Sequence, residues 1–283
     1  MTISGTTALV AHIGYPTDRF VSPLIYNPWF EQAGIDAAVV PMGCRADDYP
    51  AFLRAVFRLT NVRGALITMP HKVATAALVD EASTAVQLAG ACNAVRRLPD
   101  ARLQGDLFDG EGFVRALRRN ECQVEGARAL VVGAGGVGSA IAASLASAGA
   151  ASIAIVDTRP AAAGAVAERL AKHFPSLAVS SGDGDPAGRD LVVNATPLGT
   201  GDDDPLPIDV ARLAPGTFVG DVVMRGGATR LVSTARQHGC RVQPGTDMLF
   251  EQIPLYLAFF GFPSATPEDL RRLAEVRKLD FDR

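Results

Sequence analysis

The chain has 283 residues and a formal net charge of -3, from 30 acidic and 27 basic side chains. Because 48% of the residues are hydrophobic and charges of both signs are interleaved, we expect a globular protein of two domains with no nucleic-acid partner. No apolar run approaches the roughly 20 residues that cross a bilayer, and no basic segment precedes an apolar one at the N-terminus. The expected protein is therefore cytoplasmic, with no membrane partner.

The first part of the chain alternates between strand and helix patterns. A helix is predicted to open at Ser22-Pro23, with Ser22 as its N-cap and Pro23 in the first helical position. The other expected elements are strands at 9–13, 37–41 and 64–68, a helix at 47–58, a helix after Pro70, and extended segments at 93–97 and 102–106. This alternation predicts an α/β domain.

A second α/β series follows a predicted helix at 110–118. Its strands are short and continuously apolar, as expected for parallel strands covered on both faces. A surface loop rich in glycine and aspartate is predicted just before the third strand, and two helices should close the chain. The expected strands are 129–132, 152–156, 190–194 and 218–222, the loop is 182–189, and the helices lie beyond Asp247 on either side of 261–267.

A glycine-rich turn follows the strand at 129–132 and has the sequence Gly133-Ala134-Gly135-Gly136-Val137-Gly138. The turn opens a helix, and a second strand ends at Asp157, so the full context of a dinucleotide-binding fingerprint is present. The alternative is a glycine turn that binds no nucleotide. Asp157 would accept hydrogen bonds from ribose hydroxyls and repel a 2′-phosphate, which favours NAD over NADP. Arg159 complicates this preference, because its guanidinium could pair with a 2′-phosphate.

Lysine and cysteine usage adds two further expectations. The four cysteines lack the close spacing of a zinc site, so we expect free thiols and no bound metal. Only three lysines are present, Lys72, Lys172 and Lys278. Lys72 lies at the expected start of a helix, where a cation opposes the helix dipole, so an ordinary surface role brings a cost without a benefit. Lys72 is therefore a candidate functional residue.

Taken in order, seven segments of the chain resemble the shikimate dehydrogenase family over nearly its full length. The resemblance rests on the order of the segments, because each one alone is a modest signal. The segments are Gly14-Tyr15-Pro16 with Ser22-Pro23, then 67–72 ending in Lys72, 90–94 with Asn93, 105–110 with Asp109, the glycine turn at 133–138, 194–199, and 245–252.

The resemblance implies an N-terminal α/β substrate domain and a Rossmann domain that binds a nicotinamide cofactor, with a cleft between them. We expect residues 1–108, joined by C-terminal helices at 246–283, to form the substrate domain, and residues 109–245 to form the Rossmann domain. Members of this family interconvert a cyclic alcohol and a ketone, 3-dehydroshikimate and shikimate in the main branch, a step of aromatic amino acid biosynthesis. The implied partner is therefore a small cyclic hydroxy acid, and the protein should be a monomer or a homodimer.

The resemblance also implies roles for individual residues. Lys72 and Asp109 are the expected catalytic pair, in which the lysine ammonium stabilises alkoxide character and exchanges a proton while the aspartate holds it in register. As an alternative role, Asp109 would cap the helix that follows it. The expected substrate-binding residues are Ser22, Thr68, Asn93 and Gln252. The expected cofactor-binding residues are Gly133, Ala134, Gly135, Gly136, Val137, Gly138, Asp157, Arg159, Asn194, Ala195, Thr196, Pro197, Met224 and Gly245.

Several positions depart from the family pattern, and they cluster in the expected substrate pocket. Phe20 stands where the family has the first of two serines that hold the ring carboxylate, and Leu66 stands where it has an asparagine. Met224 replaces a tyrosine, and Leu107-Phe108 replaces a more polar pair. A site that loses a buried hydrogen-bonding partner loses roughly 1–3 kcal/mol of discrimination. We therefore expect weak activity on shikimate, or a related ring with different polar groups.

Two rival functions remain open. A catalytically idle sensor would bind NAD and a ring acid and signal through a partner, although a pure binder has no need of the lysine and the aspartate. A folate-type dehydrogenase of similar layout is disfavoured by the order of the segments. Reduction of NAD that depends on substrate would separate the enzyme from the sensor.

Overall fold

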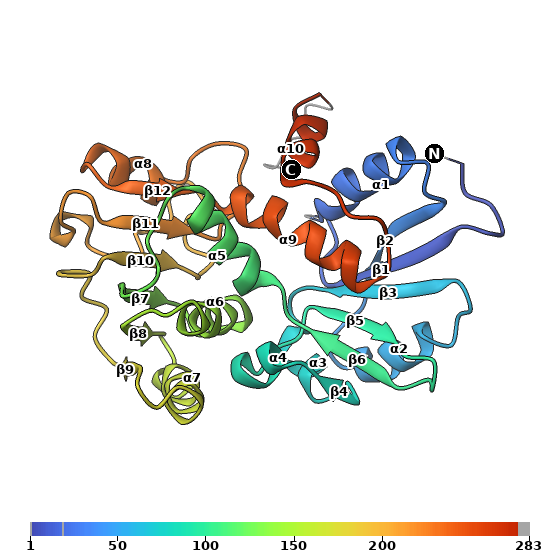
Figure 1. The fold of residues 1–283 in the computed structure, drawn as a ribbon, viewed down its shortest axis with the longest axis horizontal. Helices are drawn as coiled ribbons and strands as arrows, with labels where there is room; N and C mark the ends of the chain where they lie inside the picture. The colour runs from blue at the N-terminus through green and yellow to red at the C-terminus, as the bar shows by residue number, and fades with distance from the viewer. Residues whose placement is uncertain (1, 19, 277–283) are drawn as a thin grey trace. The chain divides into compact units, whose positions relative to one another are not determined.

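The computed structural model describes residues 2–18 and 20–276 of the chain. Within them the protein divides into two compact units. One unit holds the residues up to Phe108 and those from Ile253 onward, and the other holds Asp109–Gln252. Each unit is an α/β fold built on one six-stranded sheet, so the predicted fold class is confirmed (Figure 1).

The first unit contains a mixed sheet in the order β2-β1-β3-β5-β6-β4. Its first three strands run parallel, with β1 paired along both edges by β2 and β3 and buried from Val10 to Gly14. Strand β5 pairs antiparallel with β3 and with β6, a reversal that the sequence patterns did not predict. The strands are β1 (Ala8–Gly14), β2 (Ala37–Gly43), β3 (Val62–Ile67), β4 (Glu81–Ala82), β5 (Ala94–Arg97) and β6 (Leu103–Asp106).

The second unit contains a wholly parallel sheet in the order β12-β11-β10-β7-β8-β9. The strand order reverses between β7 and β10, and in sheets of this kind ligands bind beyond the carboxyl ends of the strands at such a point. The strands are β7 (Arg128–Val132), β8 (Ser152–Val156), β9 (Ala178–Ser181), β10 (Leu191–Asn194), β11 (Phe218–Asp221) and β12 (Arg241–Gln243).

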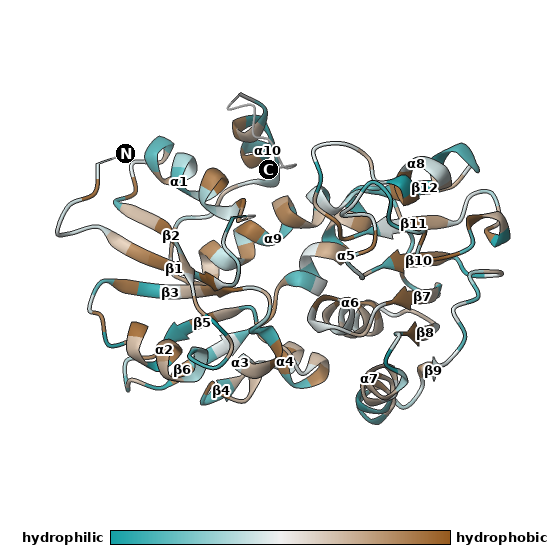
Figure 2. Cartoon of the chain, turned by 180° about the vertical axis from the view of Figure 1, so that it is seen from behind, coloured by the Kyte–Doolittle hydropathy of each residue, from teal (hydrophilic) through white to brown (hydrophobic). Residues whose placement is uncertain are grey.

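Helices pack against each sheet and bury its apolar side chains. In the first unit α1 lies against β2 and α10, and in the second unit α6 lies against β7 and β8 while α8 covers β11 and β12. Strands β7 and β8 are among the most hydrophobic segments in Figure 2, as expected for strands covered on both faces. The helices are α1 (Ser22–Gln32), α2 (Tyr49–Val56), α3 (Lys72–Ala76), α4 (Thr84–Ala89), α5 (Asp109–Arg119), α6 (Gly136–Ser147), α7 (Pro160–His173), α8 (Arg230–Gln237), α9 (Gly245–Phe259) and α10 (Pro267–Val276).

Two sequence-based expectations need correction. Helix α1 begins at Ser22, so Val21 is the N-cap and no side chain caps the helix, because its first turn is already helical one residue earlier than predicted. The C-terminal return to the first unit begins at Ile253 rather than at residue 246. The reason is local packing, since the first turns of α9 lie directly against α5 at Gly112. The end of the predicted segment, 277–283, lies outside the described residues.

Candidate functional site

The first unit brings together three of the predicted site residues through backbone hydrogen bonds. The amide of Ile67, at the end of β3, donates to the carbonyl of Asn93 at 2.8 Å, and Thr68 follows directly in the chain. The amide of Cys92 donates to the carbonyl of Lys72 at 2.8 Å. The segments that carry Thr68, Lys72 and Asn93 are therefore held side by side within one unit.

The side chain of Asn93 is half satisfied. Its Oδ1 accepts a hydrogen bond from the amide of Phe108 at 3.0 Å, and the residue is fully buried. Its Nδ2 is also buried and has no hydrogen-bond partner among the described residues. Buried amides are almost always paired, so an unpaired donor at a rigidly held position calls for an explanation. A substrate oxygen would provide one.

His71 anchors the start of α3 and was not identified from the sequence. Its Nε2 donates to the carbonyl of Cys44 at 2.8 Å, and its ring stacks on Tyr49 with 3.9 Å between centroids. Burial lowers the pKa of His71, so the ring is neutral. The Tyr49 hydroxyl lies 2.6 Å from that of Thr75, which bonds back to the His71 carbonyl. This buried cluster fixes the backbone from which Lys72 projects, and the only sequence signal was a histidine beside the lysine.

Two of the predicted departures, Phe20 and Leu66, lie near Thr68 in the first unit. Phe20 stacks on His12 of β1 with 4.1 Å between ring centroids, and His12 is in register with Leu66 of β3. At Gly14 a Cβ would stand 2.8 Å from the Phe20 ring and would overlap the methyl group of Thr68. The two apolar replacements therefore surround the predicted substrate segment. Ser22 follows at the start of α1 and is partly buried.

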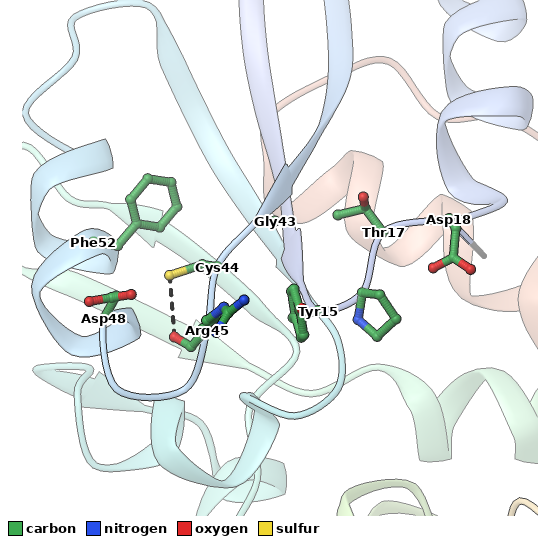
Figure 3. A pocket seen from close by; sticks show the side chains of 9 residues that line it. Tyr15, Thr17, Asp18, Gly43, Cys44, Arg45, Asp48 and Phe52 are labelled. Atoms are coloured by element: carbon green, nitrogen blue, oxygen red, sulfur yellow. Dashed lines mark hydrogen bonds between the residues drawn. The ribbon is translucent and has the colours of Figure 1, made fainter.

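A hollow of about 640 Å³ lies beside this region, between the loops that follow β1 and β2 (Figure 3). At the edge of the hollow, the guanidinium of Arg45 lies over the Tyr15 ring, 5.6 Å from its centre. The predicted site residues do not line this hollow, so we do not assign it to the predicted site. Its lining residues are Tyr15, Pro16, Thr17, Asp18, Gly43, Cys44, Arg45, Asp48 and Phe52.

The glycine turn of the second unit has the geometry that a bound pyrophosphate requires. Gly133 has a φ of +107°, and a Cβ there would lie 2.7 Å from the Ala195 carbonyl oxygen. At Gly138 a Cβ would overlap the carbonyl oxygen of Gly133. Gly135 instead faces open space and is the N-cap of α6. The turn is therefore tight where the protein packs on itself and open where phosphates would approach the helix N-terminus.

Asp157 lies immediately after β8 and is linked to the glycine turn. Its Oδ2 accepts from the amide of Ala134 at 2.7 Å, and its Oδ1 accepts from the amide and the Nε of Arg159 at 2.8 and 3.2 Å. Burial alone would raise the pKa of Asp157, but these donors outweigh it and the pKa is lowered. The carboxylate is therefore charged. The side chain of Arg159 remains 69% exposed.

A buried network holds the segment after β10. Asn194 donates to Asp221 and to the Leu198 carbonyl, both at 3.0 Å, and its Oδ1 accepts from the amide and hydroxyl of Thr196. Asp221 also accepts from the hydroxyl of Thr229 at 2.6 Å, and burial raises its pKa. The amide of Asn194 is thus engaged within the protein. We interpret Asn194 as the residue that shapes the turn containing Ala195, Thr196 and Pro197, and the sequence did not identify Asp221 or Thr229.

The remaining predicted residues also belong to the second unit. Asp109 is the buried first residue of α5, and at Gly112 on the same helix a Cβ would lie 2.7 Å from that of Gln252. The Oε1 of Gln252 is buried and has no partner among the described residues. Gly245 lies against the carbonyls of 222–223, which precede Met224, and a Cβ there would be 2.8 Å from the Val222 oxygen. Lys72 belongs to the other unit, so its meeting with Asp109 stays a prediction.

Metal ligands and membrane spans were sought within residues 2–18 and 20–276. No group of three histidine, cysteine or acidic side chains there could hold a metal ion. In the same ranges no helix combines the length and the apolar character needed to span a bilayer. The four cysteines are buried free thiols.

Comparison with family models matches two parts of the chain. Residues 12–95 match the shikimate dehydrogenase substrate binding domain, which covers β1 to β5 and includes Ser22, Thr68, Lys72 and Asn93. Residues 115–159 match the ThiF family, and this range contains β7, the glycine turn, α6, β8 and Asp157.

Full-length relatives agree with the first match. A shikimate dehydrogenase (NADP(+)) of Acidiphilium cryptum is 36% identical over 274 residues, 96% of this chain and 97% of its own. A quinate dehydrogenase of Corynebacterium glutamicum, solved in complex with NAD, is 28% identical with a TM-score of 0.85, covering 95% of this chain and 99% of that one. The 5-ketofructose reductase of Gluconobacter sp. strain CHM43 is 25% identical with a TM-score of 0.85, covering 97% and 100%.

Proposed function

This chain belongs to the shikimate dehydrogenase family, as an oxidoreductase acting on a hydroxyl group, and we propose that its substrate is a ring alcohol of the shikimate and quinate type. An analogue with fewer charged groups belongs to the same proposal, because Phe20 and Leu66 lie beside the substrate segment. The observation that carries the proposal is that backbone hydrogen bonds hold the segment from Ile67 to Lys72 beside Cys92 and Asn93. The buried Nδ2 of Asn93 has no acceptor among the described residues.

Lys72 is the proposed proton donor and acceptor at the reacting oxygen. In the oxidative direction its neutral amine would take the hydroxyl proton as the carbon–hydrogen bond breaks, and the ammonium formed would offset negative charge on that oxygen. In the reverse direction the ammonium would return the proton. Asp109 would orient the ammonium and a neighbouring substrate hydroxyl. Chain connectivity supports this, because Asp109 directly follows Phe108, and the Phe108 amide is bound to Asn93 beside the lysine segment.

The polar groups proposed to hold the substrate are the Asn93 Nδ2, the hydroxyls of Thr68 and Ser22, and the amide of Gln252. Asn93 and Gln252 each keep one buried polar atom without a described partner. A substrate hydroxyl can donate to one amide and accept from another, so both atoms would be satisfied by the same class of ligand. This is the role predicted for them from the sequence.

The residues of the glycine turn fit a nicotinamide dinucleotide, and that cofactor would supply the hydride acceptor. Gly135 leaves open space at the N-terminus of α6, where the backbone amides would hold the pyrophosphate. NAD is the proposed preference, because the charged Asp157 lies where the adenosine ribose is expected and would repel a 2′-phosphate. The relative from Acidiphilium cryptum is named for NADP(+), and the quinate dehydrogenase was solved with NAD.

The proposal is tested by following NADH and NADPH absorbance with purified protein. Shikimate, quinate and an uncharged cyclitol are offered in the oxidative direction. In the reductive direction 5-ketofructose is offered, because one solved relative is named as its reductase. We expect turnover of at least one ring alcohol, faster with NAD than with NADP.

The same assay separates the enzyme from an idle sensor. Binding is measured in parallel by the quenching of protein fluorescence as NADH and each ring compound are added. Binding of both ligands with no turnover under any condition would favour the sensor. Turnover of the ketose alone would retain the oxidoreductase and overturn the ring substrate.

A further inference from the structure

His12 occupies a position in the first unit that the proposed mechanism does not use. It lies on β1 in register with Leu66 of β3. Leu66 is two residues before Thr68 in the chain. Gly14 follows two residues after His12 on β1 and faces the same side of the sheet, and a Cβ there would meet both the Thr68 methyl group and the Phe20 ring. The stacked ring of Phe20 covers the imidazole. His12 and Phe20, here called the His12–Phe20 pair, therefore stand beside the segment that carries the predicted substrate groups.

The imidazole of His12 keeps a buried polar atom without a partner. Only 6% of the residue is exposed, and its Nδ1 has no hydrogen-bond partner among the described residues. Asn93, on the neighbouring segment of the same unit, shows the same property at Nδ2. Leaving such an atom unpaired costs free energy, which a ligand hydroxyl would recover.

The His12–Phe20 pair itself offers no charge to an anion. Burial first, and then the charge of Lys72, lower the pKa of His12 to about 3, so the ring is neutral at physiological pH. Lys72 is also the residue proposed to act on the reacting oxygen, so its ammonium is already committed there. A carboxylate placed against the His12–Phe20 pair would lose its hydration without gaining an ion pair from either ring, because both rings are uncharged. A hydroxyl would carry no such penalty.

From this juxtaposition we propose that the His12–Phe20 pair determines substrate specificity: it selects an uncharged, hydroxyl-bearing group at its end of the substrate and disfavours a carboxylate. The imidazole hydrogen-bonds that hydroxyl, and the partly exposed ring of Phe20 turns aside to admit it. This rests on the proposed function and narrows its substrate class to ring polyols without a carboxylate at that position.

A matched pair of substrates tests the charge preference. Shikimate and its methyl ester share the same ring and hydroxyls and differ in the negative charge. We expect the wild-type protein to oxidise the ester with a kcat/KM at least tenfold above that for shikimate. A preference for shikimate would overturn the inference and leave the proposed function standing. Failure to oxidise either compound, or any ring alcohol, would remove the proposed function itself.

Two substitutions test the imidazole. His12→Phe keeps an aromatic ring on Phe20 and removes both nitrogens, and we expect roughly a tenfold loss of kcat/KM on the ester, chiefly through KM. Tyr26→Phe is the matched control, because the Tyr26 hydroxyl is also buried and has no described partner. If both unpaired atoms were only features of the core, the two variants would behave alike, and equal kinetics would overturn the role of His12.

A third substitution tests the aromatic partner. Phe20→Ser replaces the ring by a hydroxyl and should bring the kcat/KM for shikimate closer to that for the ester. An unchanged ratio between the two substrates would contradict the assignment of specificity to the pair.

Discussion

The glycine turn of the second unit and the substrate segment of the first unit are built in different ways. In the glycine turn the backbone makes the site, because Gly133 and Gly138 allow close approaches while Gly135 stays open. In the substrate segment the backbone is fixed by pairing with its neighbours, and side chains decide the chemistry. His12 and Leu66 lie in register on β1 and β3, and Phe20 stacks on His12 from the segment before α1, so side chains there change while the strand pairing is kept.

The difference predicts that the proposed cofactor site is general and the proposed substrate site specific. A pyrophosphate is held by backbone amides, which every sequence supplies once the turn is formed. A substrate ring is held by individual hydroxyls and amides, so one replacement changes which ring is accepted. The four predictions below test this contrast, beginning with the residue expected to matter most.

Removing Lys72 should have the largest effect. Lys72→Met keeps the length of the side chain and removes the ammonium, so kcat on whichever ring alcohol is turned over should fall by roughly 10²–10⁴-fold. The melting temperature and the binding of NADH should stay the same. Lys172→Met, in the last turn of α7, is the control and should leave turnover intact. A Lys72→Met protein with near-normal kcat would remove the proposed proton relay.

Adding a methyl group at Gly138 should damage the cofactor site. In Gly138→Ala the new Cβ overlaps the Gly133 carbonyl, so the turn must shift, at a cost of roughly 1–3 kcal/mol in stability. The affinity for NADH should fall more than tenfold. Gly164→Ala is the control, since Gly164 lies within α7 with open space around it and should gain about 0.5–1 kcal/mol. Titration with NADH and thermal melts compare the two variants. Tight NADH binding by Gly138→Ala would contradict the assignment of the glycine turn to the cofactor.

Breaking the buried network of Asn194, Asp221 and Thr229 should mainly lower the free energy of unfolding. Asn194→Ala removes a donor from the buried Asp221 carboxylate and should lower the free energy of unfolding by about 2 kcal/mol. A double-mutant cycle with Asp221→Ala isolates the pairwise energy, and we expect the two substitutions to be strongly non-additive. Additive losses in urea unfolding would show that the two side chains act independently.

Neutralising Asp157 should give the smallest change, confined to cofactor preference. In Asp157→Asn the ratio of kcat/KM for NADP to that for NAD should rise about tenfold, because the negative charge facing a 2′-phosphate is gone. Asp185→Asn, on the loop at 182–189, removes one exposed charge from the same unit and should leave the ratio unchanged. A wild-type protein that already prefers NADP would contradict the proposed preference before any variant is made.

Much of the fold followed from local pattern. The short apolar strands of the second unit and its glycine turn were predicted within one or two residues, because continuous apolar runs and a strand–turn–helix pattern are local signals. Strands β4 and β9 carried no comparable signal, since they are short and largely outside the core. The antiparallel pairing of β5 was equally hidden, because strand direction depends on partners distant in the chain.

The residues of the candidate site likewise fall into those that the sequence predicted and those that only the structure revealed. Lys72, Asn93 and the four glycines of the turn were identified from residue type and order along the chain, and Phe20 and Leu66 were identified as departures. Tertiary structure alone revealed that His12 stacks on Phe20, that His71 anchors α3, and that Asn194 joins Asp221 and Thr229. The physical reason is range: motifs encode chemistry within a few residues, whereas burial, pKa and an unpaired nitrogen arise only when distant segments pack together.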